Sequence, residues 1–171
     1  FSHRTDEQLR RTTMNDAGID VCIESVFPPL MSYSTPEVSA EWSARALNAA
    51  LAANRVDYAG STRVMATVPL QFPTLAARVL ADAVKGDGAV AVQIATHIGD
   101  RNLDDPELDP FWAEAQRLEV LVFVHSVSPF GANRLARYHL INLIGNPTEA
   151  AVALASIIFG GVMMRFPALR F

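Results

Sequence analysis

The stretch Val120-Leu121-Val122-Phe123-Val124-His125 decides how the chain is expected to fold. Its five apolar residues, four of them β-branched or aromatic, run directly into a histidine, and Ser126 and Pro129 then end the pattern. A short, continuous apolar run bounded by loop signals predicts a strand that is buried on both faces, as in a parallel sheet. A helix is expected just before it, over 112–119. A helix that leads into a buried strand ending in a polar, ligand-type residue is typical of the catalytic face of a βα-barrel.

Similar patterns predict further strands and helices on both sides of this stretch. The other expected strands are Ile19–Val26, Arg63–Val68, Ala89–Ala95 and the last apolar residues, Ala168–Phe171. The expected helices are Asp6–Asp16, Glu37–Asn54, Pro73–Lys85, one that begins at Asp105–Pro110, Phe130–Ile144 with an irregular start, and one from Pro147 through Phe159. Strands that alternate with helices of this length predict parallel βα units, whose polar breaks share one edge of the sheet.

The predicted fold class is therefore α/β. The pattern fits either part of a (β/α)8 barrel or an open doubly wound sheet. A complete barrel needs roughly 250 residues, and this chain has 171. The absence of an initiator methionine and the last apolar residues suggest that the chain is cut from a longer one at both ends.

Composition limits the function classes. Half of the residues are hydrophobic, 19% are charged and the formal net charge is −4, which indicates a globular protein and argues against binding to nucleic acid or to an anionic membrane. The one cysteine, Cys22, is expected to be a buried thiol, and with no signal-peptide pattern this favours a cytoplasmic location. The apolar stretch Ala150–Met164 is shorter than the ~18–20 residues of a membrane span. We expect the helix over 147–159 to be covered in a larger protein and to leave an exposed apolar patch in this chain.

Histidines are the strongest candidates for chemistry. The chain has four, of which His97 and His125 lie just beyond predicted strand ends. If they meet at one edge of the sheet, they are suited to bind zinc or iron, because neutral imidazole is a common ligand of both. The alternative is that each is a hydrogen-bonded loop residue. His139 lies in a predicted helix and His3 near the start of the chain, so neither is favoured. Phosphate-binding loops, a GxSxG elbow and a CxxC pair are absent from the sequence.

Several stretches, in this order along the chain, together resemble the amidohydrolase-related (amidohydrolase 2) family typified by aminocarboxymuconate-semialdehyde decarboxylase. They are Asn15–Val21, Ala66–Gln71, Leu103–Pro106, Phe123–His125, Arg137–Leu140 with Gly145–Pro147, and Ile158–Val162 with Arg165–Pro167. The resemblance covers nearly the whole chain. It implies a distorted (β/α)8 barrel of the metal-dependent hydrolase superfamily, of which residues 1–171 form one domain fragment with about strands 2 to 6.

The resemblance also implies a site. The family holds one divalent metal, usually zinc, and His125 matches the ligand that follows the fifth strand. His97 matches a histidine near the substrate pocket of some members. No catalytic residue is expected within the chain, because the His-x-His ligand pair precedes Phe1, while the proton-transfer histidine and the ligand aspartate follow Phe171. Ser126 replaces a proline that often follows the metal histidine, and 58–62 fits the family poorly.

The function implied is non-oxidative decarboxylation of an aromatic or muconate-type carboxylic acid. A bound divalent cation stabilises the negative charge that decarboxylation builds up, and it lowers the pKa of bound water to about 7. Two alternatives stay open: hydrolysis of an amide or lactone at the same site, and an inactive, truncated remnant. The expected partner is a small carboxylic acid, with a homo-oligomer, a dimer, for the longer parent protein.

Overall fold

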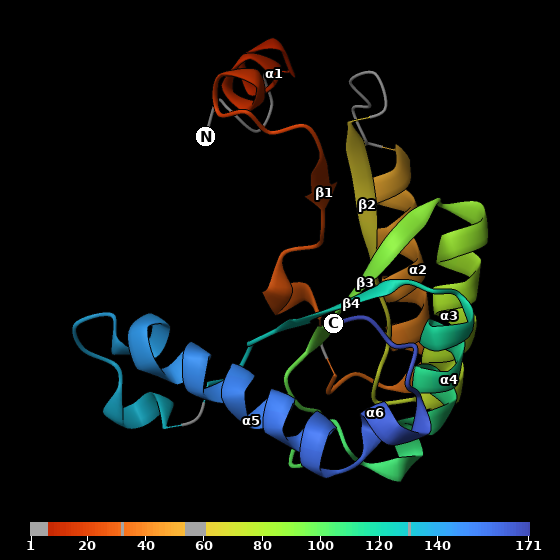
Figure 1. Cartoon of the computed structure of the whole chain (residues 1–171), viewed down its shortest axis with the longest axis vertical. Helices are drawn as coiled ribbons and strands as arrows, with labels where there is room; N and C mark the ends of the chain where they lie inside the picture. Colours follow the sequence, from red (N-terminus) through yellow and green to blue (C-terminus); the bar gives the residue numbers. More distant parts are fainter. Residues whose placement is uncertain (1–6, 32, 54–60, 130) are drawn as a thin grey trace.

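The fold is an open, parallel α/β sheet in a computed structural model that describes residues 7–31, 33–53, 61–129 and 131–171 (Figure 1). Its four strands are β1 (Cys22–Glu24), β2 (Thr62–Thr67), β3 (Ala89–Ala95) and β4 (Leu121–His125). Its helices are α1 (Glu7–Asp16), α2 (Glu37–Ala53), α3 (Pro73–Gly86), α4 (Asp109–Arg117), α5 (Asn146–Phe159) and α6 (Val162–Arg165). Short 3-10 turns cover Pro28–Leu30, Pro106–Leu108 and Ala132–Arg134, and a π-helical segment, Ile141–Gly145, precedes α5.

The strands pair in the order β1-β2-β3-β4, and every pair is parallel. All four therefore end at one edge of the sheet, which we call the carboxyl edge. The predicted parallel arrangement is thus confirmed. Arg170 begins a further parallel contact with Leu121 of β4, as expected for the start of another strand at the end of the chain.

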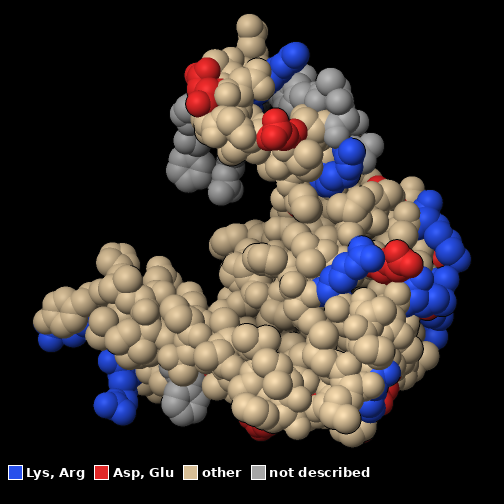
Figure 2. All heavy atoms as spheres, in the orientation of Figure 1, with Lys and Arg blue, Asp and Glu red and all other residues tan. Residues whose placement is uncertain are grey.

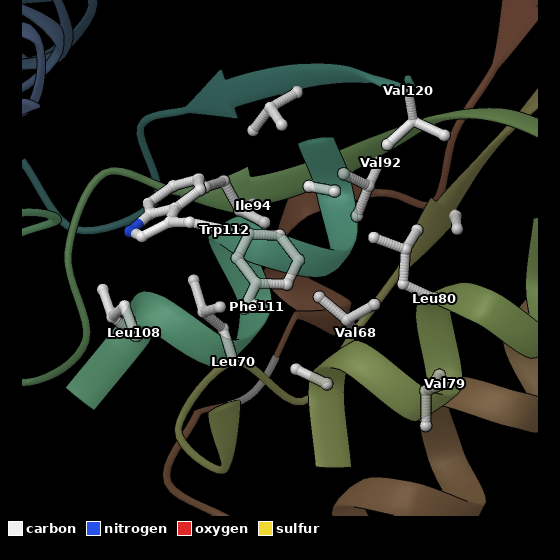
Figure 3. Close-up of a cluster of buried hydrophobic side chains, with 14 of the residues drawn as sticks. Val68, Leu70, Val79, Leu80, Val92, Ile94, Leu108, Phe111, Trp112 and Val120 are labelled. Atoms are coloured by element: carbon white, nitrogen blue, oxygen red, sulfur yellow. The ribbon is translucent and has the colours of Figure 1, made fainter. Parts of the chain in front are cut away.

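One face of the sheet carries the hydrophobic core, and α2, α3 and α4 stand side by side over it (Figure 1). Alternate strand residues face these helices, because side chains in a strand point to opposite faces in turn. Val92 and Ile94 of β3 and Val120 beside β4 pack there against Leu80, Phe111 and Trp112 (Figure 3). The strand residues that alternate with these, such as Gln93 of β3 and His125 of β4, therefore lie on the other face.

Asn48 joins α2 to the sheet from within the core. Its side chain is buried, its Nδ2 donates to the Thr67 carbonyl at 3.0 Å, and its Oδ1 accepts from the Thr67 N–H at 2.8 Å. Both backbone groups of Thr67 thus depend on one side chain.

We expect Asn48→Ala to lower the free energy of unfolding by about 2–4 kcal/mol, because it leaves a buried N–H and a buried C=O unpaired. Urea denaturation followed by circular dichroism measures the change. The control is Asn15→Ala on the exposed surface of α1, which should stay within about 0.5 kcal/mol of the unmodified chain. Equal effects of the two substitutions would contradict this role of Asn48.

The predicted helix over Phe130–Ile144 is irregular over a longer part than expected: 131–139 is not α-helical, and Phe130 lies outside the described residues. It contains the turn Ala132–Arg134, and Gly131, Tyr138 and His139 have positive φ angles of 69°, 59° and 54°. Left-handed residues cannot continue a right-handed helix, so the helical segment begins only at Ile141. His139 consequently lies in an exposed turn.

The structure also differs from two smaller expectations, the length of the first strand and the burial of Cys22. The first strand is three residues long, not eight, because only Cys22–Glu24 pairs with β2 and Val21 and Ile23 are exposed. Cys22 is half-buried and not buried, with Arg10 donating to its Sγ at 3.4 Å. His3 and most of the predicted loop over 57–62 lie outside the described residues.

α5 leaves most of its apolar side chains exposed in this chain, as expected. Only Glu149, Ala153 and Ile157 are buried, whereas Phe159 is 87% exposed. Figure 2 shows charged residues gathered over α2–α4, while the concave side between α1 and α5 carries few. The continuous helix Ile141–Phe159 has 19 residues and passes a membrane-span test of length and composition, a test that core helices also pass. The uncharged stretch that begins at Ala150 is shorter than this helix because Glu149 interrupts the apolar residues.

Candidate functional site at the carboxyl edge of the sheet

His125 is the last residue of β4 and stands directly beside Ala95, the last residue of β3. Its ring is half-buried, and Nδ1 lies 2.7 Å from the carbonyl oxygen of Ser126. Because a carbonyl accepts, Nδ1 carries the proton in this contact and Nε2 keeps its lone pair. Backbone contacts of this kind orient metal-ligating histidines in proteins.

His97 follows β3 by two residues, so both histidines lie at the carboxyl edge, as predicted. Its Nδ1 lies 2.8 Å from the Gly99 carbonyl oxygen and its Nε2 lies 3.2 Å from the Ser128 carbonyl oxygen. Both ring nitrogens face acceptors, an arrangement that leaves no lone pair directed at a metal. The hydrogen-bond geometry therefore distinguishes the two histidines. His125 is suited to be a metal ligand, and His97 is not.

Glu149 and Thr96 belong to the same cluster, and sequence reasoning gave neither a role. Glu149 is 8% exposed; its Oε2 accepts a hydrogen bond from Thr96 Oγ1 at 3.3 Å and lies 3.8 Å from Nε2 of His97. Asn146, one helical turn earlier in α5, accepts at Oδ1 from Ser126 Oγ at 3.1 Å. The first turn of α5 is thereby tied to the loops after β3 and β4.

A hollow of about 380 Å³ lies at this edge. Loops that follow β1, β3 and β4 line it, through Pro28, Pro29, Met31, Tyr33, Ser34, His97, Gly99, Val127 and Ser128. Its walls combine apolar side chains with His97 and a tyrosine, which is the usual make-up of a small-molecule pocket.

Tyr33 places a half-buried phenol in the wall of this hollow. Its hydroxyl oxygen accepts a hydrogen bond from the Ala95 N–H at 3.2 Å, so its own proton remains available for donation. Burial raises the pKa of Tyr33 well above its ordinary value near 10, and the hydrogen bond from Ala95 opposes this only in part. Tyr33 therefore stays neutral in the folded protein.

This shift makes stability depend on pH. The unfolded phenol ionises above about pH 10 while the folded phenol keeps its proton, so the contribution of Tyr33 is complete below pH 10 and is lost as pH rises towards the folded pKa. We expect the difference in unfolding free energy between the unmodified chain and Tyr33→Phe to shrink by about 1 kcal/mol between pH 8 and pH 11. Urea titrations at each pH measure it, with the exposed Tyr138→Phe as control. A constant difference would contradict the assignment.

Comparison with known proteins identifies the family. The family model described as amidohydrolase matches residues 4–171. The chain belongs to this amidohydrolase family. The resemblance found in the sequence is confirmed. The fold class, a partial (β/α)8 barrel, is confirmed too, since the parallel sheet with helices over one face belongs to this family and matches a solved decarboxylase structure.

Two curated relatives of this amidohydrolase chain are decarboxylases. The 2-amino-3-carboxymuconate-6-semialdehyde decarboxylase of Dictyostelium discoideum is 29% identical over 165 residues, which cover 96% of this chain and 46% of the relative. The gamma-resorcylate decarboxylase of a Polaromonas species is 29% identical over 181 residues, covering 99% and 55%. The chain spans about half the length of the curated relatives it matches.

Solved structures of decarboxylases share the fold of this chain. One is a dihydroxybenzoic acid decarboxylase from Polaromonas, solved with manganese and the inhibitor 2-nitroresorcinol. Its TM-score is 0.83 at 27% identity, and the matched segment covers 96% of this chain and 53% of the decarboxylase chain. The 5-carboxyvanillate decarboxylase of Sphingomonas paucimobilis has a TM-score of 0.84 at 21% identity, covering 96% and 49%, and supports the fold alone.

The metal implied by the family fits this amidohydrolase chain only in part. The orientation of His125 suits one ligand, but within the described ranges no three His, Cys, Asp or Glu side chains come together. A catalytic zinc site needs about three protein ligands. The described residues therefore do not form a metal site by themselves.

Proposed function

We propose that the protein is a metal-dependent, non-oxidative decarboxylase of an aromatic or muconate-type carboxylic acid. The observation that carries this proposal is the placement of His125, with Nε2 available, at the carboxyl edge of a sheet that belongs to the amidohydrolase family. The two curated relatives, both named as decarboxylases, favour decarboxylation over amide or lactone hydrolysis.

Within this proposal His125 is one metal ligand and His97 lines the substrate pocket. The remaining ligands and the proton-transfer group belong to chain outside residues 1–171. A bound divalent cation would stabilise the negative charge that develops on the carbon that loses carbon dioxide. The structure with manganese supports a divalent metal; zinc is our first choice for this protein. For residues 1–171 alone we propose no catalytic activity.

The test is release of carbon dioxide by the full-length protein from 2,6-dihydroxybenzoate and from 2-amino-3-carboxymuconate semialdehyde, with zinc or manganese added. Substrate loss is followed by absorbance. Release of carbon dioxide from either acid supports the proposal. Hydrolysis of an amide or lactone panel without carbon dioxide release would overturn it in favour of a hydrolase.

Two accompanying proposals concern the setting of the protein. We propose a cytoplasmic location, supported by the single, half-buried cysteine, and a homodimer of the full-length protein. The location can be tested by fractionation of cells that express a tagged copy. The dimer can be tested by analytical ultracentrifugation.

A further inference from the structure

Glu149 is a buried acid that the proposed reaction does not use. Its side chain is 10% exposed, although it lies in the first turn of α5, where an acid is usually solvated. Burying a carboxylate is costly unless hydrogen bonds and an opposite charge compensate for the lost water. Its contacts should therefore indicate which groups compensate for the burial of this carboxylate.

Those contacts lead to the loop after β3. Glu149 Oε2 accepts from Thr96 Oγ1 at 3.3 Å, and Thr96 is 1% exposed, so water does not compete for this hydrogen bond. The same oxygen lies 3.8 Å from Nε2 of His97. One carboxylate oxygen thus faces two consecutive residues of the loop after β3.

His97 continues the connection to the loop after β4. Its Nε2 lies 3.2 Å from the carbonyl oxygen of Ser128, three residues beyond His125. The other ring nitrogen, Nδ1, lies 2.8 Å from the Gly99 carbonyl oxygen, so backbone carbonyls flank the ring on both sides. A chain of contacts therefore runs from Glu149 through His97 to the loop that follows the candidate ligand.

We propose that Glu149 is a positioning residue: it fixes the His97 ring and, through it, the loop that holds His125 at the carboxyl edge. The part concerning His125 rests on the proposed function, whereas the link between Glu149 and His97 does not. Outer-shell contacts of this kind keep metal ligands in place, and their removal commonly lowers metal affinity about 10–100-fold.

The first experiment uses this chain and the reaction of histidines with diethylpyrocarbonate, located by mass spectrometry of peptides. The variants are Glu149→Gln, which keeps the shape of the side chain and removes its charge, and Glu149→Ala. The control is Glu41→Gln on α2, and exposed His139 is the internal reference. We expect His97 to react about ten-fold faster relative to His139 in both Glu149 variants, because this factor corresponds to the loss of one typical buried contact. Its rate should be unchanged in Glu41→Gln.

A second measurement separates positioning from loss of fold. In the long-range ¹H–¹⁵N spectrum, the ring signals of His97 should move in Glu149→Gln while those of His139 stay in place. Unchanged His97 signals and an unchanged His97 reaction rate in Glu149→Gln would overturn the proposal. Glu149→Gln preserves the size of the side chain, so this result is decisive even if Glu149→Ala does not fold.

The third measurement addresses His125 in the full-length protein, with Mn²⁺ alone as the probe. Glu149→Gln should weaken Mn²⁺ binding about ten-fold, and Glu41→Gln should leave it unchanged. Unchanged Mn²⁺ affinity in Glu149→Gln, where His125→Ala abolishes binding, would overturn the link to His125. If His125→Ala itself keeps full Mn²⁺ binding, the proposed function fails while the reactivity of His97 still tests the Glu149 contact.

Discussion

Under the proposed function, His125→Ala in the full-length protein should remove most of the bound divalent metal and lower decarboxylation by at least about 100-fold. Loss of outer-shell partners alone costs 10–100-fold, and loss of a ligand removes a direct bond. The fold should survive, because the ring hydrogen bond of His125 reaches only to the backbone of Ser126. Elemental analysis gives the metal stoichiometry, and substrate absorbance gives the rate.

His139→Ala is the matched control, since His139 lies in an exposed turn. It should retain a full equivalent of metal and normal turnover. In residues 1–171 alone, His125 should bind Zn²⁺ no better than His139 does, because tight binding needs several ligands that close on the ion together. A His125→Ala protein with a full equivalent of metal would show that the ligand assignment is wrong.

The position of His125 could be predicted from sequence because two simple patterns agree. The apolar run before it defines a buried strand, and the alternation of strands with helices makes neighbouring strands parallel. Parallel strands bring their ends to one edge, so His97 and His125 both had to lie at that edge. The chemical difference between them was not predictable, because it depends on which backbone carbonyl each ring nitrogen meets.

Other features depended on contacts between distant parts of the chain. An acid after proline in the first turn of a helix is the ordinary pattern of a helix start, so Glu149 gave no sign of its burial. Its partners Thr96 and His97 come close only after β3 and α5 have packed. Likewise, the apolar residues around Tyr138 and His139 are typical of a helix, but their left-handed backbone prevents one.

The core is the part of the fold in which sequence and structure agree most closely, and Trp112 is central to it. Trp112 lies in the helix predicted just before the decisive strand, and none of its surface is exposed. Its ring packs against Phe111 and Phe171, with centroid separations of 5.0 and 5.7 Å. Among the described residues its indole Nε1–H finds no hydrogen-bond partner. The contribution of Trp112 should therefore come from packing alone.

We expect Trp112→Ala to lower the free energy of unfolding of this chain by about 3–5 kcal/mol, because the surrounding side chains cannot fill the cavity it leaves. This is a large part of the 5–15 kcal/mol that stabilises a typical domain, so the variant should be partly unfolded at 37 °C. Trp112→Phe keeps most of the packing and removes the unpaired N–H, so it should stay within about 1.5 kcal/mol. The control is Trp42→Ala, since Trp42 is 74% exposed on α2 and its loss should change stability by less than about 0.5 kcal/mol. Urea denaturation followed by circular dichroism compares the three variants.

A destabilisation by Trp42→Ala equal to that by Trp112→Ala would show that the core is not centred on Trp112.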